Sequence, residues 1–168
     1  MTLQYIAQPG SGTIAFDRYL RYLETVRDRL PADAWRFASD PRHHDLRSPQ
    51  TLHDAWLDRI AICEDASGDR REIRRLRIDV ELLGAFHDRR IRLGYTGVHA
   101  YRFDVPAAVG ARFERVAHGD LIAHELRARE GGGGGIVHEL MFERRGTFVV
   151  ECDAISHVQE MITDSSAV

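Results

Sequence analysis

Lysine and asparagine are both absent from the sequence, and all 23 basic residues are arginine. Codons for both missing residues are rich in adenine, so their absence favours a GC-rich, bacterial genome. The alternative, that arginine was selected for bidentate contacts with phosphate, is disfavoured because acidic residues outnumber arginines, 26 to 23. The net charge of −3 gives no general cationic field for nucleic acid or an anionic membrane, so we expect neither as a partner.

Cysteine is scarce as well. The chain has two, Cys63 and Cys152, and their separation excludes a disulfide scaffold and a cysteine-rich zinc site. No apolar stretch approaches the ~20 residues that span a bilayer. The first residues also lack the basic and then apolar pattern of a signal peptide. Together these absences predict a cytoplasmic location.

What is present is the composition of an ordinary globular domain. Hydrophobic residues make up 43% and charged residues 29% of 168 residues, which suits one domain with its own core. We expect a single domain over 1–168. It would comprise a helical segment and loop over 1–50, a β region over 51–160 and a frayed tail over 161–168.

The first apolar pattern is helical. Within residues 13–30, apolar side chains at spacings of three and four share one helical face, namely Phe16, Leu20, Leu23, Val26 and Leu30. Ser11 or Thr13 is expected to cap this helix, and Pro31 to end it or to open a second helix over 31–39. The stretch 40–50 contains His43 and His44, two prolines and no apolar period, which predicts an exposed loop.

After residue 51 the apolar period changes to two, which indicates strands. In 74–83, for example, Leu76 and Val80 belong to an apolar series that alternates with charged residues. One packed and one wet face is typical of antiparallel sheet. Gly94 and Gly97 interrupt the third stretch and predict a bulge or bend. The predicted strands are 52–64, 74–83, 90–105, 121–129, 136–143 and 147–155.

These elements predict an α+β fold that is mainly β. Strands that follow one another tend to pair, so we expect the N-terminal helix to precede an antiparallel six-stranded meander, curled or barrel-like. The helix would cover an apolar face or an open edge of the sheet. Since no helix lies between the strands, a parallel, doubly wound nucleotide fold is disfavoured. The five-glycine run at 131–135 predicts a hairpin tip.

The nine histidines do not form HxH, HExxH or HxxEH spacing, which would place two imidazoles at ligand distance. A hairpin centred on Gly133 pairs residues whose numbers sum to 266. That register places His124 and His138 on one face but about 13 Å apart, at ~3.3 Å per residue. We therefore expect no metal site and no cofactor.

His53 and Asp54 lie in the LHDA segment at 52–55. In a strand they would point to opposite faces, so they would not form an adjacent acid–base pair without a bulge. A structural role for His53 or Asp54, bonding backbone amides where the sheet begins, is the favoured interpretation. Arginines at 70–77 and 89–92 are interleaved with acidic residues, which predicts a solvated, cross-strand-paired face.

Five segments between residues 51 and 155 resemble a loose group of small bacterial β domains: LHDAWLDRI, RLRIDVELL, IRLGYTGV, GDLIAHELRA and IVHELMFERRGTFVVECDAI. In this group an LHDA or LHDS strand precedes a meander. Its members include domains of unknown function, and some are similar to immunity proteins of toxin systems. The group has no agreed catalytic residues, so the resemblance implies a protein-binding rather than a catalytic role.

Two functional hypotheses follow. The first is a cytosolic, non-catalytic module, immunity-like, that binds a protein partner or forms a homo-oligomer, with no catalytic residues. The alternative is a small-ligand binder or hydrolytic enzyme with its pocket inside the curled sheet. That pocket would use His53, Asp54, His99 or His124 with Glu125.

Overall fold

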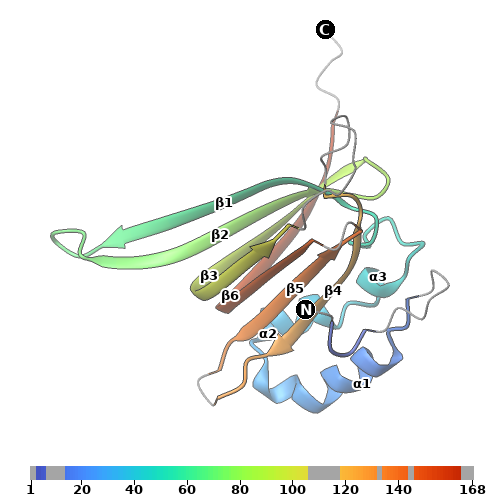
Figure 1. The fold of residues 1–168 in the computed structure, drawn as a ribbon, viewed down its shortest axis with the longest axis horizontal. Coiled ribbons are helices and arrows are strands. Elements are labelled where there is room, and N and C mark those ends of the chain that lie inside the picture. Colours follow the sequence, from blue (N-terminus) through green and yellow to red (C-terminus); the bar gives the residue numbers. More distant parts are fainter. Residues whose placement is uncertain (1–2, 7–13, 106–117, 132–133, 144–145, 164–168) are drawn as a thin grey trace, which may run out of the picture.

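The computed structural model describes residues 3–6, 14–105, 118–131, 134–143 and 146–163. The fold is α+β and mainly β, as predicted, with short helices that precede a six-stranded antiparallel sheet (Figure 1). The helical elements are α1 (Asp17–Val26), the 3-10 turn η1 (Arg27–Arg29), α2 (Ala32–Ala38) and α3 (Pro41–His44). The strands are β1 (Trp56–Ser67), β2 (Ile73–Leu83), β3 (Arg89–Asp104), β4 (Leu121–Ala128), β5 (Ile136–Phe142) and β6 (Thr147–Met161).

The order of the strands corrects the predicted meander. They lie in the order β1-β2-β3-β6-β5-β4, so the last strand is central and β4 is an edge. Length explains this order, because β3 has 16 residues and the 15-residue β6 pairs with it from end to end. A β4 of eight residues would have left half of β3 without a neighbour.

The sheet curls without closing. At one corner the starts of the two edge strands meet through a bridge between Trp56 and Asp120. The Leu121 carbonyl and amide there bond the Asp54 amide and the Ala55 carbonyl, each at 2.9 Å. Gly97, with a φ of 62°, precedes an irregularity in β3, which confirms the predicted bend. Beyond it β2 leaves β3, so the sheet splays at the opposite end (Figure 1).

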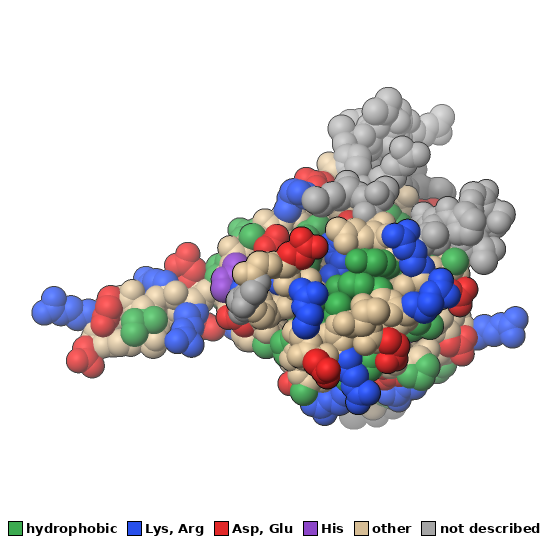
Figure 2. Space-filling view, turned by 90° about the horizontal axis from the view of Figure 1, so that it is seen from below, with side chains coloured by type: hydrophobic (Ala, Val, Ile, Leu, Met, Phe, Trp, Pro, Cys, Tyr) green, Lys and Arg blue, Asp and Glu red, His purple; other side chains and the backbone are tan. Residues whose placement is uncertain are grey.

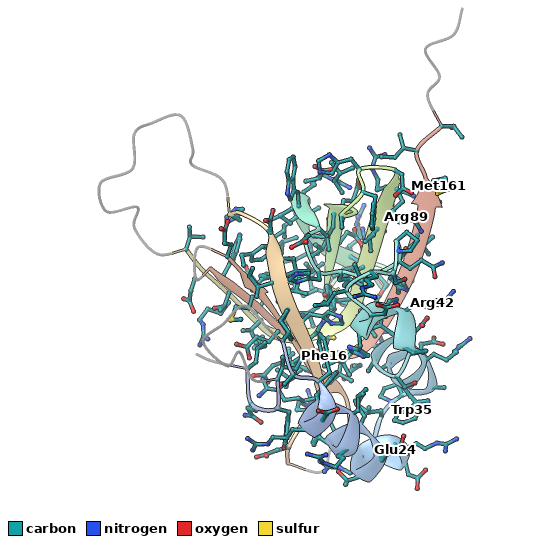
Figure 3. All side chains as sticks on the ribbon, turned by 90° about the vertical axis from the view of Figure 1, so that its right-hand side faces the viewer. Phe16, Glu24, Trp35, Arg42, Arg89 and Met161 are labelled. Atoms are coloured by element: carbon teal, nitrogen blue, oxygen red, sulfur yellow. The ribbon has the colours of Figure 1, made fainter. Side chains whose placement is uncertain are left out.

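The helices cover the concave face of the sheet, where Ile78, Val80 and Leu82 are fully buried. Helix α2 packs on β6 and β4, and α1 packs on β4. Figure 3 looks onto this layer, with Glu24 on α1 and Trp35 on α2 on the same side of the sheet. Among the described residues no helix has the length and apolarity needed to cross a membrane.

The apolar face of the first helix differs from its prediction in one position. Tyr19 is fully buried, whereas Leu20 is 41% exposed. The predicted caps Ser11 and Thr13 lie outside the described residues, as do Gly132 and Gly133 of the glycine run. The second helix and the hairpin between β4 and β5 are confirmed.

Candidate functional site

His53 and Asp54 lie in a turn before β1 rather than in a strand, so the expectation of opposite faces is wrong. Asp54 takes a φ of 62°, and its Oδ1 approaches His53 Nε2 to 3.1 Å. The other ring nitrogen, Nδ1, donates to the Ile122 carbonyl at 2.7 Å. His53 therefore ties the start of β1 to strand β4, which is the backbone-bonding role favoured from the sequence.

The remaining predicted site residues do not join this pair. His99 Nε2 meets Asp153 Oδ1 at 2.6 Å on the exposed bend of β3. Glu125 is fully buried and accepts hydrogen bonds from three backbone amides of residues 4–6, at 2.7 to 3.1 Å. His124 and Glu125 are successive strand residues on opposite faces. The five predicted residues are thus distributed over four places in the fold.

A histidine cluster that the sequence did not predict lies beneath α2 and α3. Phe37 is at its centre, with four imidazole centroids 4.9 to 5.4 Å from its ring. His43 is only 3% exposed, which corrects the prediction of an exposed loop over 40–50. The physical reason is that Asp40 and Pro41 start a helical turn that carries the loop inward. The histidine cluster comprises His43, His44, His124, His138 and His157.

Two of these imidazoles touch, against the expected separation of 13 Å. Residues of the β4–β5 hairpin that face each other sum to 264 rather than 266, so His124 lies opposite Leu140 and His138 lies opposite Leu126. This shift of two keeps both rings on one face and makes them diagonal neighbours. Their Nδ1 and Nε2 atoms are 3.1 Å apart, and the Tyr95 hydroxyl lies 2.8 Å from the other nitrogen of His138.

Burial keeps the cluster uncharged near neutral pH. It lowers the pKa of His138 to about 3 and that of His157 to about 4. The pKa values of the other three are also lowered, chiefly by burial. His43 and His44 each donate one ring N–H to a carbonyl of α2, at 2.9 and 2.7 Å. The Nε2 of His124 has no hydrogen-bond partner among the described residues.

The cluster opens to solvent at one side. A hollow of about 350 Å³ is lined by His43, His157, Asp33, Arg36 and Asp40, among others. In the described part of the chain, no three His, Cys, Asp or Glu side chains are grouped so as to hold a metal ion. The hollow therefore offers hydrogen bonds from two imidazoles and charges of both signs at its rim.

The opposite face of β4 and β5 carries a buried charge network. Arg127 lies 3.4 Å from Glu125 and 3.2 Å from Glu139. Burial raises the pKa of Glu139. A second hollow of about 490 Å³ lies beside this network and is lined by arginines, Tyr5 and Tyr22, among others. Since Arg127 is already neutralised by two carboxylates, the network stabilises the attachment of residues 4–6.

The edge strand β4 is sealed by side chains. The Tyr19 hydroxyl both donates to the Leu126 carbonyl and accepts from the Leu126 amide, at 2.9 Å each. The Tyr22 hydroxyl accepts from the Ala128 amide at 3.0 Å. With His53 on the Ile122 carbonyl, side chains thus bond backbone groups of residues 122, 126 and 128 on this edge, where another strand would otherwise pair.

The other edge strand, β1, is open. We call the outer side of residues 57–67 the open edge, because no described strand pairs with it. We call residues 64–76 the arm, because β1 and β2 there pair only with each other. Figure 2 shows the arm as a narrow ribbon that stands out from the body and carries acidic, basic and hydrophobic side chains.

On the convex face of β1, β2, β3 and β6 the charges pair across strands, as the sequence predicted. Arg59 contacts Glu81 at 2.8 Å and Arg77 contacts Asp65 at 3.3 Å. Arg92 meets Glu160 at 2.7 Å. The arginines of this face therefore form ion pairs with acidic residues of the same face.

Comparison with known proteins assigns no family to the chain: no family model matches it, and a search of curated proteins finds no match. Its function is therefore inferred from the residues described above.

Proposed function

We propose that the chain is a non-catalytic, protein-binding module that recruits an extended segment of its partner as an added strand on the open edge of β1. The observation that carries this proposal is the unequal treatment of the two sheet edges. Tyr19, Tyr22 and His53 bond backbone groups on the outer side of β4, whereas no described strand pairs with the outer side of β1. Unpaired strand groups are a template for another strand.

Apolar side chains along β1 and the arm support the same proposal. Ile62 is 46% exposed and Ile73 is 48% exposed. Each side chain alone is ordinary on a protein surface. Ile62, however, lies beside the unpaired backbone of β1, where an apolar side chain adds buried area to the hydrogen bonds that an added strand forms.

The resemblance to small bacterial β domains fits this mode of binding. Some of those domains are similar to immunity proteins, which act by holding another protein. Strand addition leaves the body of the domain unchanged, so the arm can bind without disturbing the buried histidine cluster. An immunity-like role is the specific form of this proposal.

Selection from a displayed library of extended peptides tests the proposal. The wild-type chain should enrich alternating apolar peptides, and Ile62→Lys should abolish the enrichment because it places a charge at the centre of the open edge. Val158→Lys is the matched control, since Val158 is 49% exposed on β6, away from β1. Equal enrichment by wild type and Ile62→Lys, or none by either, would contradict strand addition.

A second candidate function is favoured by the hollow over the histidine cluster. Imidazoles of His43 and His157 reach a concave site whose volume suits a small ligand. We propose a small polar ligand that is bound by hydrogen bonds to the two imidazoles, since Arg36 at the rim is already paired with Asp33. The test is titration with a fragment library while the NMR resonances of the histidines are recorded. The resonances of His43 and His157 should shift, and that of His53 should not. Equal shifts of all histidine resonances would contradict a specific site.

A further inference from the structure

We infer that the strand added to β1 is β1 of a second copy of this chain, in an antiparallel, two-fold symmetric dimer centred on Ile62. The inference rests on the proposed function and names its partner. Two copies joined in this way would form one continuous sheet, with the concave faces of both copies on the same side. A closed two-fold pair is also the commonest way in which identical chains assemble.

The charge pattern of β1 selects the register. In a two-fold pair whose concave faces lie on the same side, each residue pairs with a partner residue on the same face of its strand. The residue numbers of such a pair therefore add up to an even number, which is called the sum of the register. A sum of 122 brings Asp58, in the irregularity between Leu57 and Arg59, beside Glu64 of the partner subunit, and a sum of 128 places Glu64 opposite the partner's Glu64. Like charges directly opposite are destabilising, so both registers are disfavoured.

Sums of 120 and 126 avoid like charges but form no opposite-charge pair. The sum of 124 places Arg59 opposite the partner's Asp65, and by symmetry Asp65 opposite the partner's Arg59. It also places Ile62 opposite the partner's Ile62 on the axis. Of these five registers, the one centred on Ile62 is therefore alone in forming complementary charges at both ends.

Contacts already within each chain extend this pattern. Arg59 lies 2.8 Å from Glu81, and Asp65 lies 3.3 Å from Arg77. Pairing Arg59 with the partner's Asp65 joins these two bonds into a row of alternating charge across the interface. On the concave face, Ile62 meets the partner's Ile62 on the axis, and the half-buried Ile60 lies opposite the partner's Glu64.

The dimer also covers the arm. In this register the partner's residues 65–67 lie beside residues 57–59, at the base of β1. Each arm therefore runs along the body of the other copy. An edge-to-edge contact of this kind is smaller than a standard interface of about 1,600 Å², so we expect self-association at roughly micromolar affinity.

Sedimentation equilibrium of charge-swapped variants tests the register. Arg59→Asp alone places two acidic groups opposite each other, and Asp65→Arg alone places two arginines opposite each other. Each should weaken self-association at least tenfold. An equimolar mixture of the two variants should restore the dimer, because each charge then meets its opposite. Failure of the mixture to dimerise, when wild type does, overturns the register centred on Ile62.

Cysteine cross-linking provides a second measurement. Ile62→Cys combined with Cys63→Ser should form a covalent dimer under mild oxidation, since residue 62 faces itself. Glu64→Cys with Cys63→Ser is the matched control and should not. Wild-type chains linked through Cys63 instead would indicate a sum of 126 and would overturn the inference. The remaining thiol, Cys152, is buried, with its pKa raised to about 12 by burial.

The two proposals fail differently. Wild-type protein that remains monomeric at concentrations far above micromolar overturns the second-copy inference. In that case the peptide selection with Ile62→Lys and Val158→Lys still decides whether the open edge binds a strand of another protein. A dimer that persists undiminished in Ile62→Lys overturns both the register and the use of this edge.

Discussion

The two edge strands of this sheet differ in what contacts their outer sides. The backbone of β4 is covered by α1 and bonded by two tyrosine hydroxyls and an imidazole. Strand β1 runs from the body into a projecting arm whose outer side has no strand partner in the described chain. Both strands start at the same corner, where Asp120 bridges Trp56.

This difference separates stability from binding. Sealing β4 with side chains fixes the helices on the sheet and prevents a further strand from pairing there. Leaving β1 open costs little stability, because the arm contributes few buried side chains. The sheet thus leaves the outer side of β1 available to a partner. Substitutions in the body and in the arm should therefore differ in their effect on stability.

The largest effect is expected inside strand β2, which passes through both regions. Val80→Asp should unfold the protein, because Val80 is fully buried and an unpaired charge there costs several kcal/mol. Leu76→Asp, on the same face but in the half-buried arm, should cost only about 1 kcal/mol. Urea denaturation measures both. Equal losses would mean that the arm is part of the core.

The second-largest effect is expected from acidification, which should lower the stability of the folded protein through the histidine cluster beneath the helices. In the folded chain the pKa values of all five clustered histidines lie below their unfolded value of 6.5. The unfolded chain therefore binds more protons below pH 6.5, so stability is complete above that pH. It falls as the pH drops toward about 4, by up to ~1.4 kcal/mol per pH unit for each histidine.

Opposing groups define the control for this measurement. Glu139, on the other face, has a raised pKa, so its protonation on acidification stabilises the folded protein and partly offsets the loss from the histidines. Asp40, whose pKa is lowered to about 2 by hydrogen bonds from Arg42, loses stability only below pH 4. His157→Gln should reduce the slope between pH 4 and 6.5 by one histidine's share, measured by urea unfolding. An unchanged slope would show that His157 does not contribute.

The sealed edge itself should respond to Tyr19→Phe. This change leaves a buried amide and carbonyl of Leu126 without their partner, which should cost about 2 to 3 kcal/mol. Tyr22→Phe removes one bond from a less buried site and should cost about 1 kcal/mol. Thermal melts compare the pair. A larger loss from Tyr22→Phe would contradict the assignment of Tyr19 as the main seal.

The smallest effect is expected on the convex face of the arm. Arg75 is exposed on β2 and faces Asp65 of β1. Arg75→Ala should change stability by less than ~0.5 kcal/mol, as exposed ion pairs usually contribute little. Chemical denaturation checks this value. A severe loss would place Arg75 on the packed face and shift the register of the arm by one residue.

The strands were predictable because alternation reports which face is buried. Val80 and Ile78 were placed on the packed face from the sequence, and the structure buries both completely. The first helix was predicted less accurately, because Tyr19 was not recognised as an apolar side chain with a hydroxyl for the sheet edge. Alternation carries no information on strand order, so it does not predict the central position of β6.

The histidine cluster was missed for two physical reasons. A shift of two residues in the hairpin keeps every side chain on its face, so periodicity alone could not distinguish His124 opposite Leu140 from His124 opposite Phe142. His43 lies in a stretch without apolar period, and only Asp40 followed by Pro41 marked a helical start. His53 was given its structural role correctly but the wrong local conformation.

The central position of β6 has a consequence for how the chain is made. Residues 147–161 leave the ribosome after the other five strands, yet they join the β1–β2–β3 half of the sheet to the β4–β5 hairpin. Until they emerge, the long β3 has only β2 as a neighbour, along part of its length. The sheet therefore cannot be completed before β6 has emerged, and such distant pairing is slow, in milliseconds to seconds. During that interval the nascent halves expose apolar strands and depend on protection from aggregation.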